Sequence, residues 1–308
     1  MSVDPQQPAG AGPGTATVAA PPEVTARADE ARQARREQFR LLWRSKTFIA
    51  GGLILLVWVI CAVFGETIAP DDPFTTDPLN DLAAPSGDHW FGTDRLGRDV
   101  LSRVIVGARD ILIVAPLATL LGTALGTVLG LLTGYFRGAV DDVLSRIIDA
   151  FLALPVIIVG LMAIVALGPS NVTVIFVIGL VFAPVIARTV RAAVLTEREY
   201  EYVAAARLRN EHTAYIMFAE ILPNVSGPIL VEFTVRLGYA IFTIATLSFL
   251  GLGIQPPAPD WGVQIFEQYG LISGGYWWPV LFPALAIASL VVAVNLMADG
   301  VTQAFERG

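Results

Sequence analysis

The sequence predicts an all-α membrane protein with six transmembrane helices. Of its 308 residues, 55% are hydrophobic and only 15% are charged, whereas about 25% of the residues in a typical soluble domain are charged. The apolar residues gather in blocks of about 20, which is the length a helix needs to cross the hydrocarbon core of a bilayer. Both observations place the chain in a membrane.

The expected spans follow one another along most of the chain. The first contains an uncharged run at 48–65. The second carries a glycine at every fourth position, from Gly122 to Gly134. Small residues at this spacing allow another helix to approach closely, so we interpret them as a packing face and not as a ligand site. The six predicted spans are 47–67, 109–135, 146–167, 172–194, 227–250 and 280–304.

The segment before the first span, 1–46, is predicted to be a cytoplasmic tail. Residues 1–28 are rich in Pro, Gly, Ala and Thr and are expected to be disordered, while 29–46 are charged and favour a helix. A signal peptide is not expected, because the basic region is too long and the apolar run lacks a small-x-small cleavage site.

Lys and Arg near the ends of the spans predict the orientation. The segment before the first span and the loop 195–226 are rich in arginine, whereas the loop 251–279 contains none. Both termini are therefore expected in the cytoplasm. The segment 68–108 mixes arginine with aspartate, and we place it outside because the even number of spans requires it.

Several classes of function are disfavoured by composition. The single cysteine, Cys61, lies in an apolar run, so no disulfide framework or cysteine metal cluster is expected. His89 and His212 are expected on opposite faces of the membrane, so we predict no metal site and no histidine-based catalytic triad. Lys46 is the only lysine, so no phosphate-binding GxxxxGK[ST] loop is present and this subunit is not expected to be an ATPase or another enzyme. The net charge of -7 argues against a nucleic-acid partner.

The loop 195–226 contains an amphipathic segment, EYVAAARLRNEHTAYIMFAEILPN, between two apolar spans. Such a long connector is unusual between packed helices, which suggests that a partner outside the bilayer binds it. The segment resembles the cytoplasmic EAA loop of ABC-importer permeases, in which a short coupling helix docks onto an ATPase subunit. The resemblance assigns this coupling to Glu201, Tyr202, Val203, Ala205, Ala206, Arg207, Asn210, Leu222, Pro223 and Asn224.

Two positions of this loop depart from the family's pattern. Asn210 occupies a turn where Gly is usual, and Glu220 stands where a basic residue or His is common. Asn adopts the left-handed conformation more readily than most residues, so the turn is expected to be kept. Glu220 changes the local charge of the surface that a partner meets.

Three further segments are similar to the C-type permeases of dipeptide and oligopeptide importers. They are FGTDRLGRDVLSR (91–103), SFLGLGIQPPAPDWG (248–262) and WWPVLFPALAIASLVVAVNLMADG (277–300). The resemblance implies the type I ABC-importer permease fold, with a five-helix core at 109–304. It also implies a second, homologous permease, two ABC ATPases that bind ATP and Mg, an extracytoplasmic substrate-binding protein and a peptide substrate, with no cofactor on this chain. Importers of nickel, glutathione or another small solute remain open, and a stand-alone channel or ion-coupled carrier is a remote alternative.

Charged residues within the spans are candidates for the translocation pathway. Glu232 and Arg236 lie one helical turn apart, so they are expected either to pair with each other or to line an aqueous path. Asp149 in the third span is a further pathway candidate.

The segment 89–110 is predicted to form a short helix on the outer membrane surface. Leu96, Val100 and Val104 have helical spacing, which suits an apolar face at the headgroup boundary. The alternative is a spacer that only sets the angle of the second span. The candidates for the entrance beneath the binding protein are Arg95, Arg98, Asp99 and Arg103.

Overall fold

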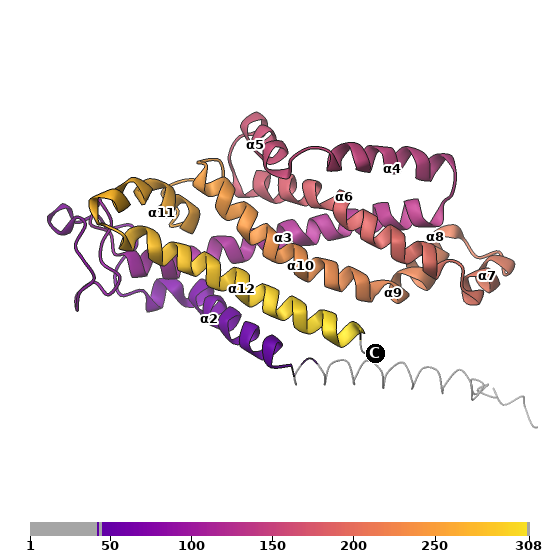
Figure 1. Cartoon of the computed structure of the whole chain (residues 1–308), viewed down its shortest axis with the longest axis horizontal. Coiled ribbons are helices and arrows are strands. Elements are labelled where there is room, and N and C mark those ends of the chain that lie inside the picture. The colour runs from indigo at the N-terminus through magenta and orange to yellow at the C-terminus, as the bar shows by residue number, and fades with distance from the viewer. Residues whose placement is uncertain (1–41, 43–44, 307–308) are drawn as a thin grey trace, which may run out of the picture.

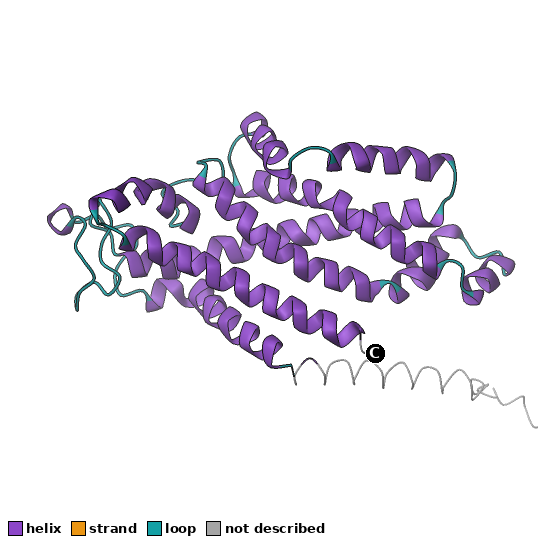
Figure 2. Cartoon of the chain, viewed as in Figure 1, coloured by secondary structure: helices purple, strands orange, loops and turns teal. Residues whose placement is uncertain are grey.

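The computed structural model describes residue 42 and residues 45–306, so the predictions for the tail 1–41 and for 43–44 lie outside the described residues. The described part is helical, and its one β pairing is an isolated antiparallel bridge between Thr93 and Asp99 (Figure 2). In chain order the helices are α2 (Lys46–Ile68), η1 (Pro78–Asn80), α3 (Val100–Tyr135), α4 (Ala139–Leu152), α5 (Val156–Leu167), α6 (Asn171–Glu197), α7 (Glu201–Leu208), α8 (Thr213–Tyr215), η2 (Ile216–Ile221), α9 (Leu222–Asn224), α10 (Ser226–Phe249), α11 (Trp261–Gln268), η3 (Tyr269–Gly274) and α12 (Trp278–Glu306).

Five helices, α2, α3, α6, α10 and α12, are long and apolar enough to cross a membrane (Figure 1). They correspond to the predicted first, second, fourth, fifth and sixth spans, and the all-α prediction is confirmed. The longest, α3, has 36 residues. At 1.5 Å per residue it measures about 54 Å, which exceeds the ~30 Å hydrocarbon core, so part of α3 projects beyond it.

The third predicted span is bent instead of straight. Helices α4 and α5 meet at 90° across a short break that ends at Pro155. Proline removes a backbone donor and disfavours the helical conformation of the residue before it, here Leu154. Arg191 of α6 holds α4 through two hydrogen bonds to Asp141, of 2.7 and 2.8 Å. The third predicted span, 146–167, therefore corresponds to this bent pair of helices.

The glycines of the second span are packing positions, as predicted. A Cβ added at Gly126 would lie 2.7 Å from the carbonyl oxygen of Ala183, and one at Gly130 would lie 2.6 Å from Cβ of Val190. Because both partners belong to α6 and follow the same order, α3 and α6 run parallel in close contact. Glycine is required there because the backbones leave no room for a side chain.

Helix α2 packs against α12, so the first span is held by the last. The Trp58 indole donates a hydrogen bond to Ser289 Oγ at 2.9 Å, and the Trp58 ring meets the ring of Trp261 edge-on at 4.7 Å. The opposite face of α2 is exposed, with Leu53 and Val63 more than half accessible.

The connections gather at two ends of the bundle (Figure 1). The segment 69–99 and α11 lie at one end, and α7, α8 and α9 lie at the other. The segment that contains His89 is thus far from α8, whose N-cap is His212, and the two histidines do not share one site.

The predicted surface helix between His89 and Asp110 is not a separate element. Helix α3 begins at Val100 and continues without a break into the second span. Val100 and Val104 are 1% and 3% exposed, and α11 packs beside Val104, whose carbonyl oxygen accepts a hydrogen bond of 2.9 Å from the Trp261 indole. Of the predicted apolar stripe, Val100 and Val104 are buried in protein whereas Leu96 is 44% exposed, and the helix that contains the second span begins at Val100.

Candidate coupling site and outer polar cluster

The loop between α6 and α10 is folded. Helix α7 begins after Tyr200 and is followed by Asn210, which has a φ of 55°. This is the left-handed conformation predicted for that turn, and asparagine adopts it at low cost. The chain then reverses and enters α8.

The two faces of α7 have different surroundings. Val203 and Ala206 are fully buried within this chain, while Ala205 is exposed and Leu208 is 85% exposed. Residues three apart share a helix face, which explains why Val203 and Ala206 turn inward together. Ala206, predicted to contact the ATPase, is packed inside this chain. The exposed face of α7 carries Ala205 and Leu208.

The return segment is shaped by its proline. In the π-helical turn η2, the Leu222 N–H donates to the Met217 carbonyl oxygen, five residues back. Pro223 follows and has no N–H to donate, which favours such a widened turn. Ile216 and Ile221 of this turn are buried in one core with Val203. Phe218 stays about half exposed.

Tyr202 joins three parts of the loop. Its hydroxyl donates to Glu197 Oε1 at 2.7 Å and accepts from Asn224 Nδ2 at 3.1 Å. Asn224 Nδ2 also donates to the Glu220 carbonyl oxygen at 2.8 Å. Burial, and then the hydrogen bond to Glu197, raise the pKa of Tyr202, so the phenol remains a donor. Glu197 was not predicted, because it lies in α6 outside the recognised motif.

Arginines attach the same loop to α3. Arg198 donates to the carbonyl oxygens of Gly134 and Tyr135 at 3.1 and 2.7 Å, which occupies acceptors left free at the end of α3. The Arg207 guanidinium lies over the Tyr135 ring, 5.1 Å from its centroid. Glu220, one of the two departures from the family pattern, pairs with Arg209 at 3.5 Å.

The other coupling residues occupy the two ends of the folded loop. Glu201 lies in the first turn of α7, where the positive end of the helix dipole stabilises its carboxylate. Leu222 is half-buried and Pro223 is exposed.

The pathway candidates form two ion pairs. Arg236 Nε donates to Glu232 Oε1 at 2.6 Å within α10, as the one-turn spacing predicts. Asp149 of α4 pairs with Arg188 of α6 at 3.2 Å, and both side chains are more than half exposed.

The entrance candidates lie in a buried polar cluster. Arg98 donates to Asp94 Oδ2 at 2.7 Å and to Glu267 Oε2 of α11 at 2.9 Å. Arg103 is 2% exposed and donates to the Pro73 carbonyl oxygen at 3.1 Å. Asp99 caps α3 through Ser102 N at 2.7 Å. Arg98, Asp99 and Arg103 therefore hold the outer end together and do not face the outside, and of the four candidates Arg95 is the exposed one.

A second outer group has the composition of metal ligands. Asp71, His89 and Asp99 each offer one side-chain ligand atom, and these three atoms lie within 4.8 Å of one another. The prediction of no metal site rested on the two histidines alone, whereas the fold brings Asp71 and Asp99, from other parts of the chain, to His89.

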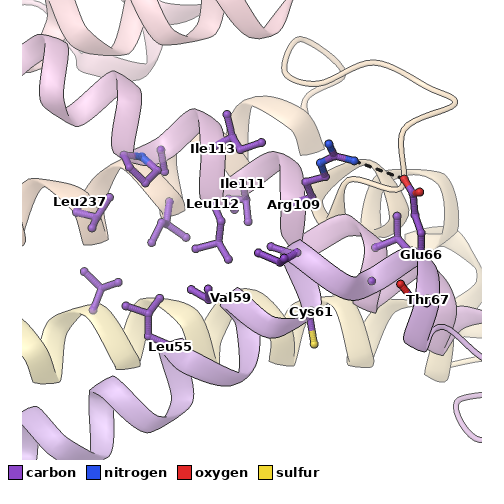
Figure 3. Close-up of a pocket in the computed structure, with 18 residues that line it drawn as sticks. Leu55, Val59, Cys61, Glu66, Thr67, Arg109, Ile111, Leu112, Ile113 and Leu237 are labelled. Carbon is purple, nitrogen blue, oxygen red and sulfur yellow. Dashed lines mark hydrogen bonds and ion pairs between the residues drawn. The ribbon is translucent and has the colours of Figure 1, made fainter.

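A groove of about 640 Å³ opens between α2 and α3 (Figure 3). Leu55, Val59 and Leu112 lie along it, with Leu237 from α10, and Arg109 and Glu66 pair at 3.4 Å beside it. Its mostly aliphatic lining suits hydrocarbon better than a polar solute.

A bundle of five or six apolar helices with a folded polar loop at one end is the architecture of an integral membrane protein. The family model described as "Binding-protein-dependent transport system inner membrane component" matches residues 126–308, and "N-terminal TM domain of oligopeptide transport permease C" matches 34–85. The chain belongs to this family of inner-membrane permeases.

Curated relatives match along nearly the whole chain. The dipeptide transport system permease protein DppC of Alkalihalophilus pseudofirmus is 37% identical over 88% of this chain and 89% of its own. DppC of Bacillus subtilis is 37% identical over 88% and 85%. The glutathione transport system permease protein GsiD of Escherichia coli O157:H7 is 37% identical over 90% and 92%.

A solved structure, described as inward facing conformations of the MetNI methionine ABC transporter, has a similar fold. The TM-score is 0.54 at 22% identity, covering 66% of this chain and 95% of that one. The type I importer fold expected from the sequence is confirmed.

Proposed function

We propose that this chain is a permease subunit of an ATP-driven importer of dipeptides and oligopeptides. The observation that carries the proposal is the folded loop at α7, joined to α3, α6 and the start of α10, in a chain whose relatives include dipeptide permeases. The chain forms half of the translocation pathway and does no covalent chemistry.

The partners follow from what this chain lacks. Its only lysine, Lys46, is not in a phosphate-binding loop, so ATP and Mg are bound by two partner ATPases. A second, homologous permease completes the pathway, and an extracytoplasmic binding protein delivers the substrate. Both termini of this chain are cytoplasmic, on the side of the ATPases.

Coupling operates through the exposed face of α7. Leu208 projects from the end of α7 and, with Ala205, offers a small apolar surface to a groove in the ATPase. When the ATPases close, α7 moves, and the bonds from Tyr202 to Glu197 and Asn224 transmit this movement to α6 and to the start of α10. The helices then alternate between inward-open and outward-open arrangements.

Glutathione is a second candidate substrate. The glutathione permease GsiD covers as much of the chain, at the same 37% identity, as the dipeptide permeases. Glutathione is itself a small peptide, so one pathway could carry both.

Uptake measurements test the proposal. In cells that lack other peptide importers, the complete system should take up a labelled dipeptide, and deletion of this chain should abolish that uptake. Competition with unlabelled glutathione separates the two substrates. Uptake that persists without this chain contradicts the proposal, as does recovery of the chain from detergent without any ATPase.

A further inference from the structure

We propose that Asp71, His89 and Asp99 bind a zinc ion at the outer end of the bundle. The three residues come from different places in the chain: Asp71 follows α2, His89 lies in the connecting segment, and Asp99 is the N-cap of α3. Nδ1 of His89 lies 3.1 Å from Asp99 Oδ1 and 3.7 Å from Asp71 Oδ2.

The geometry is unusual for a simple ion pair. Both carboxylates are directed at the same ring nitrogen, which carries at most one proton. Asp99 is within hydrogen-bond distance of that nitrogen, whereas Asp71 at 3.7 Å is too far for a hydrogen bond. One proton on Nδ1 therefore leaves the Asp71 carboxylate without a bond to the imidazole.

A metal ion explains the convergence better than a proton. In a tetrahedral zinc site with bonds of about 2.0–2.2 Å, neighbouring ligand atoms are about 3.3–3.6 Å apart. The observed 3.1 and 3.7 Å lie on either side of this range, and all three donor atoms lie within 4.8 Å of one another, so the side chains must shift to complete the site. Two carboxylates and a neutral imidazole carry a charge of about -2, which a divalent ion balances, and nitrogen and oxygen donors are suitable for zinc.

Ser102 positions two of the ligands. Its backbone N–H and its hydroxyl donate to Asp99 Oδ2, at 2.7 and 2.8 Å, which directs Oδ1 toward His89. The Ser102 hydroxyl oxygen also accepts from the Asp71 backbone N–H at 3.0 Å. Metal sites depend on such outer hydrogen bonds to orient their ligands.

The three ligand side chains differ in burial, so an ion can reach the site from solvent. The Asp99 side chain is 2% exposed, that of His89 is 23% exposed and that of Asp71 is 52% exposed. The site thus has a buried floor and an open side, where a water molecule takes the fourth position. The bound ion ties the chain that leaves α2 to the first turn of α3.

Metal content after chelation and reloading tests this proposal. The full-length chain is purified with its co-purifying subunits through a tag without histidines, stripped with a chelator, incubated with Zn²⁺ and passed over a sizing column. Wild type should retain about one more zinc per chain than Asp71→Asn and His89→Gln. Asp99→Asn should lose the same zinc while keeping the helix cap, because asparagine also caps helices.

The matched control is Asp72→Asn, because the Asp72 carboxylate accepts only local bonds, from Phe74 N and Thr75 Oγ1, both at 2.9 Å. Asp72→Asn should retain as much zinc as wild type. Added Zn²⁺ should raise the melting temperatures of wild type and Asp72→Asn, but it should leave the melting temperature of Asp71→Asn unchanged. X-ray absorption should show nitrogen and oxygen ligands. An equal zinc content in all variants, or a sulfur ligand on the zinc, overturns the proposal.

Discussion

The side-chain amide of Asn224 donates a hydrogen bond of 3.1 Å to the hydroxyl of Tyr202. Asn224 closes the Leu-Pro-Asn turn before α10, and Tyr202 lies in the first turn of α7 and bonds to Glu197 at the end of α6. One phenol therefore connects α7 with the end of α6, which crosses the membrane, and with α9, which leads into α10.

Removing this hydroxyl should weaken coupling more than folding. We expect Tyr202→Phe to lower the amount of peptide taken up per ATP hydrolysed by several-fold, because about 1 kcal/mol is lost for each hydrogen bond. The measurement is uptake and ATP hydrolysis by the complete system in vesicles. Tyr200→Phe, at an exposed neighbouring position, is the control. Unchanged coupling in Tyr202→Phe contradicts the role of this bond.

Leu208 and Ala206 should respond differently to a charge. Leu208→Glu changes an 85% exposed side chain, so the chain should fold but capture at least tenfold less ATPase in a pull-down. Ala206→Glu buries a carboxylate in a filled core, which is costly, so its yield and melting temperature should fall. Full ATPase capture by Leu208→Glu would place the docking surface elsewhere.

The buried arginine of the outer cluster should matter for stability. Arg103→Met removes a cation that is 2% exposed, lies 3.9 Å from Asp94 and bonds to the Pro73 carbonyl. Breaking a buried charge cluster from one side costs about 3 kcal/mol or more, which a thermal melt in detergent detects. The exposed Arg95→Ala should melt like wild type. Equal melting of both variants is the result that contradicts this prediction.

Asp260 should make stability depend on pH. Burial is the main cause that raises the pKa of this carboxyl from 3.8 to about 6, against the hydrogen bond from Val263 N that lowers it. Between pH 4 and 6 the folded state therefore holds a proton that the unfolded state has released, so stability falls as pH rises through this window and stays lower above it.

The variant Asp260→Asn keeps the cap of α11, since asparagine accepts the same Val263 N–H, but it cannot ionise. Its melting temperature should change less than that of wild type between pH 4.5 and 7.5 and should be higher at the upper pH. Parallel melting curves for the two proteins over this range would show that Asp260 does not titrate there.

Much of the fold was predictable from the sequence because membrane insertion depends on local properties. The uncharged run in α2 and the apolar blocks of α6 and α10 are long enough to span a bilayer in any tertiary arrangement. The glycine spacing in α3 indicated close packing, because a missing side chain admits a neighbouring backbone whichever helix supplies it. The left-handed turn at Asn210 was likewise local, since it depends on the residue's own backbone preference.

Only the tertiary structure decided which surfaces were buried. Hydropathy does not distinguish a straight span from α4 and α5 bent at Pro155, because both are equally apolar. The apolar spacing of Val100 and Val104 was compatible with a membrane surface, but both residues are buried, and Trp261, distant in sequence, binds the Val104 carbonyl oxygen. In the same way, the sequence determined that Ala206 and Leu208 belong to one amphipathic helix, while the packing of η2 against α7 decided that Ala206 is inside and Leu208 outside. Burial is a property of the neighbours that folding brings together, and those neighbours are not adjacent in the chain.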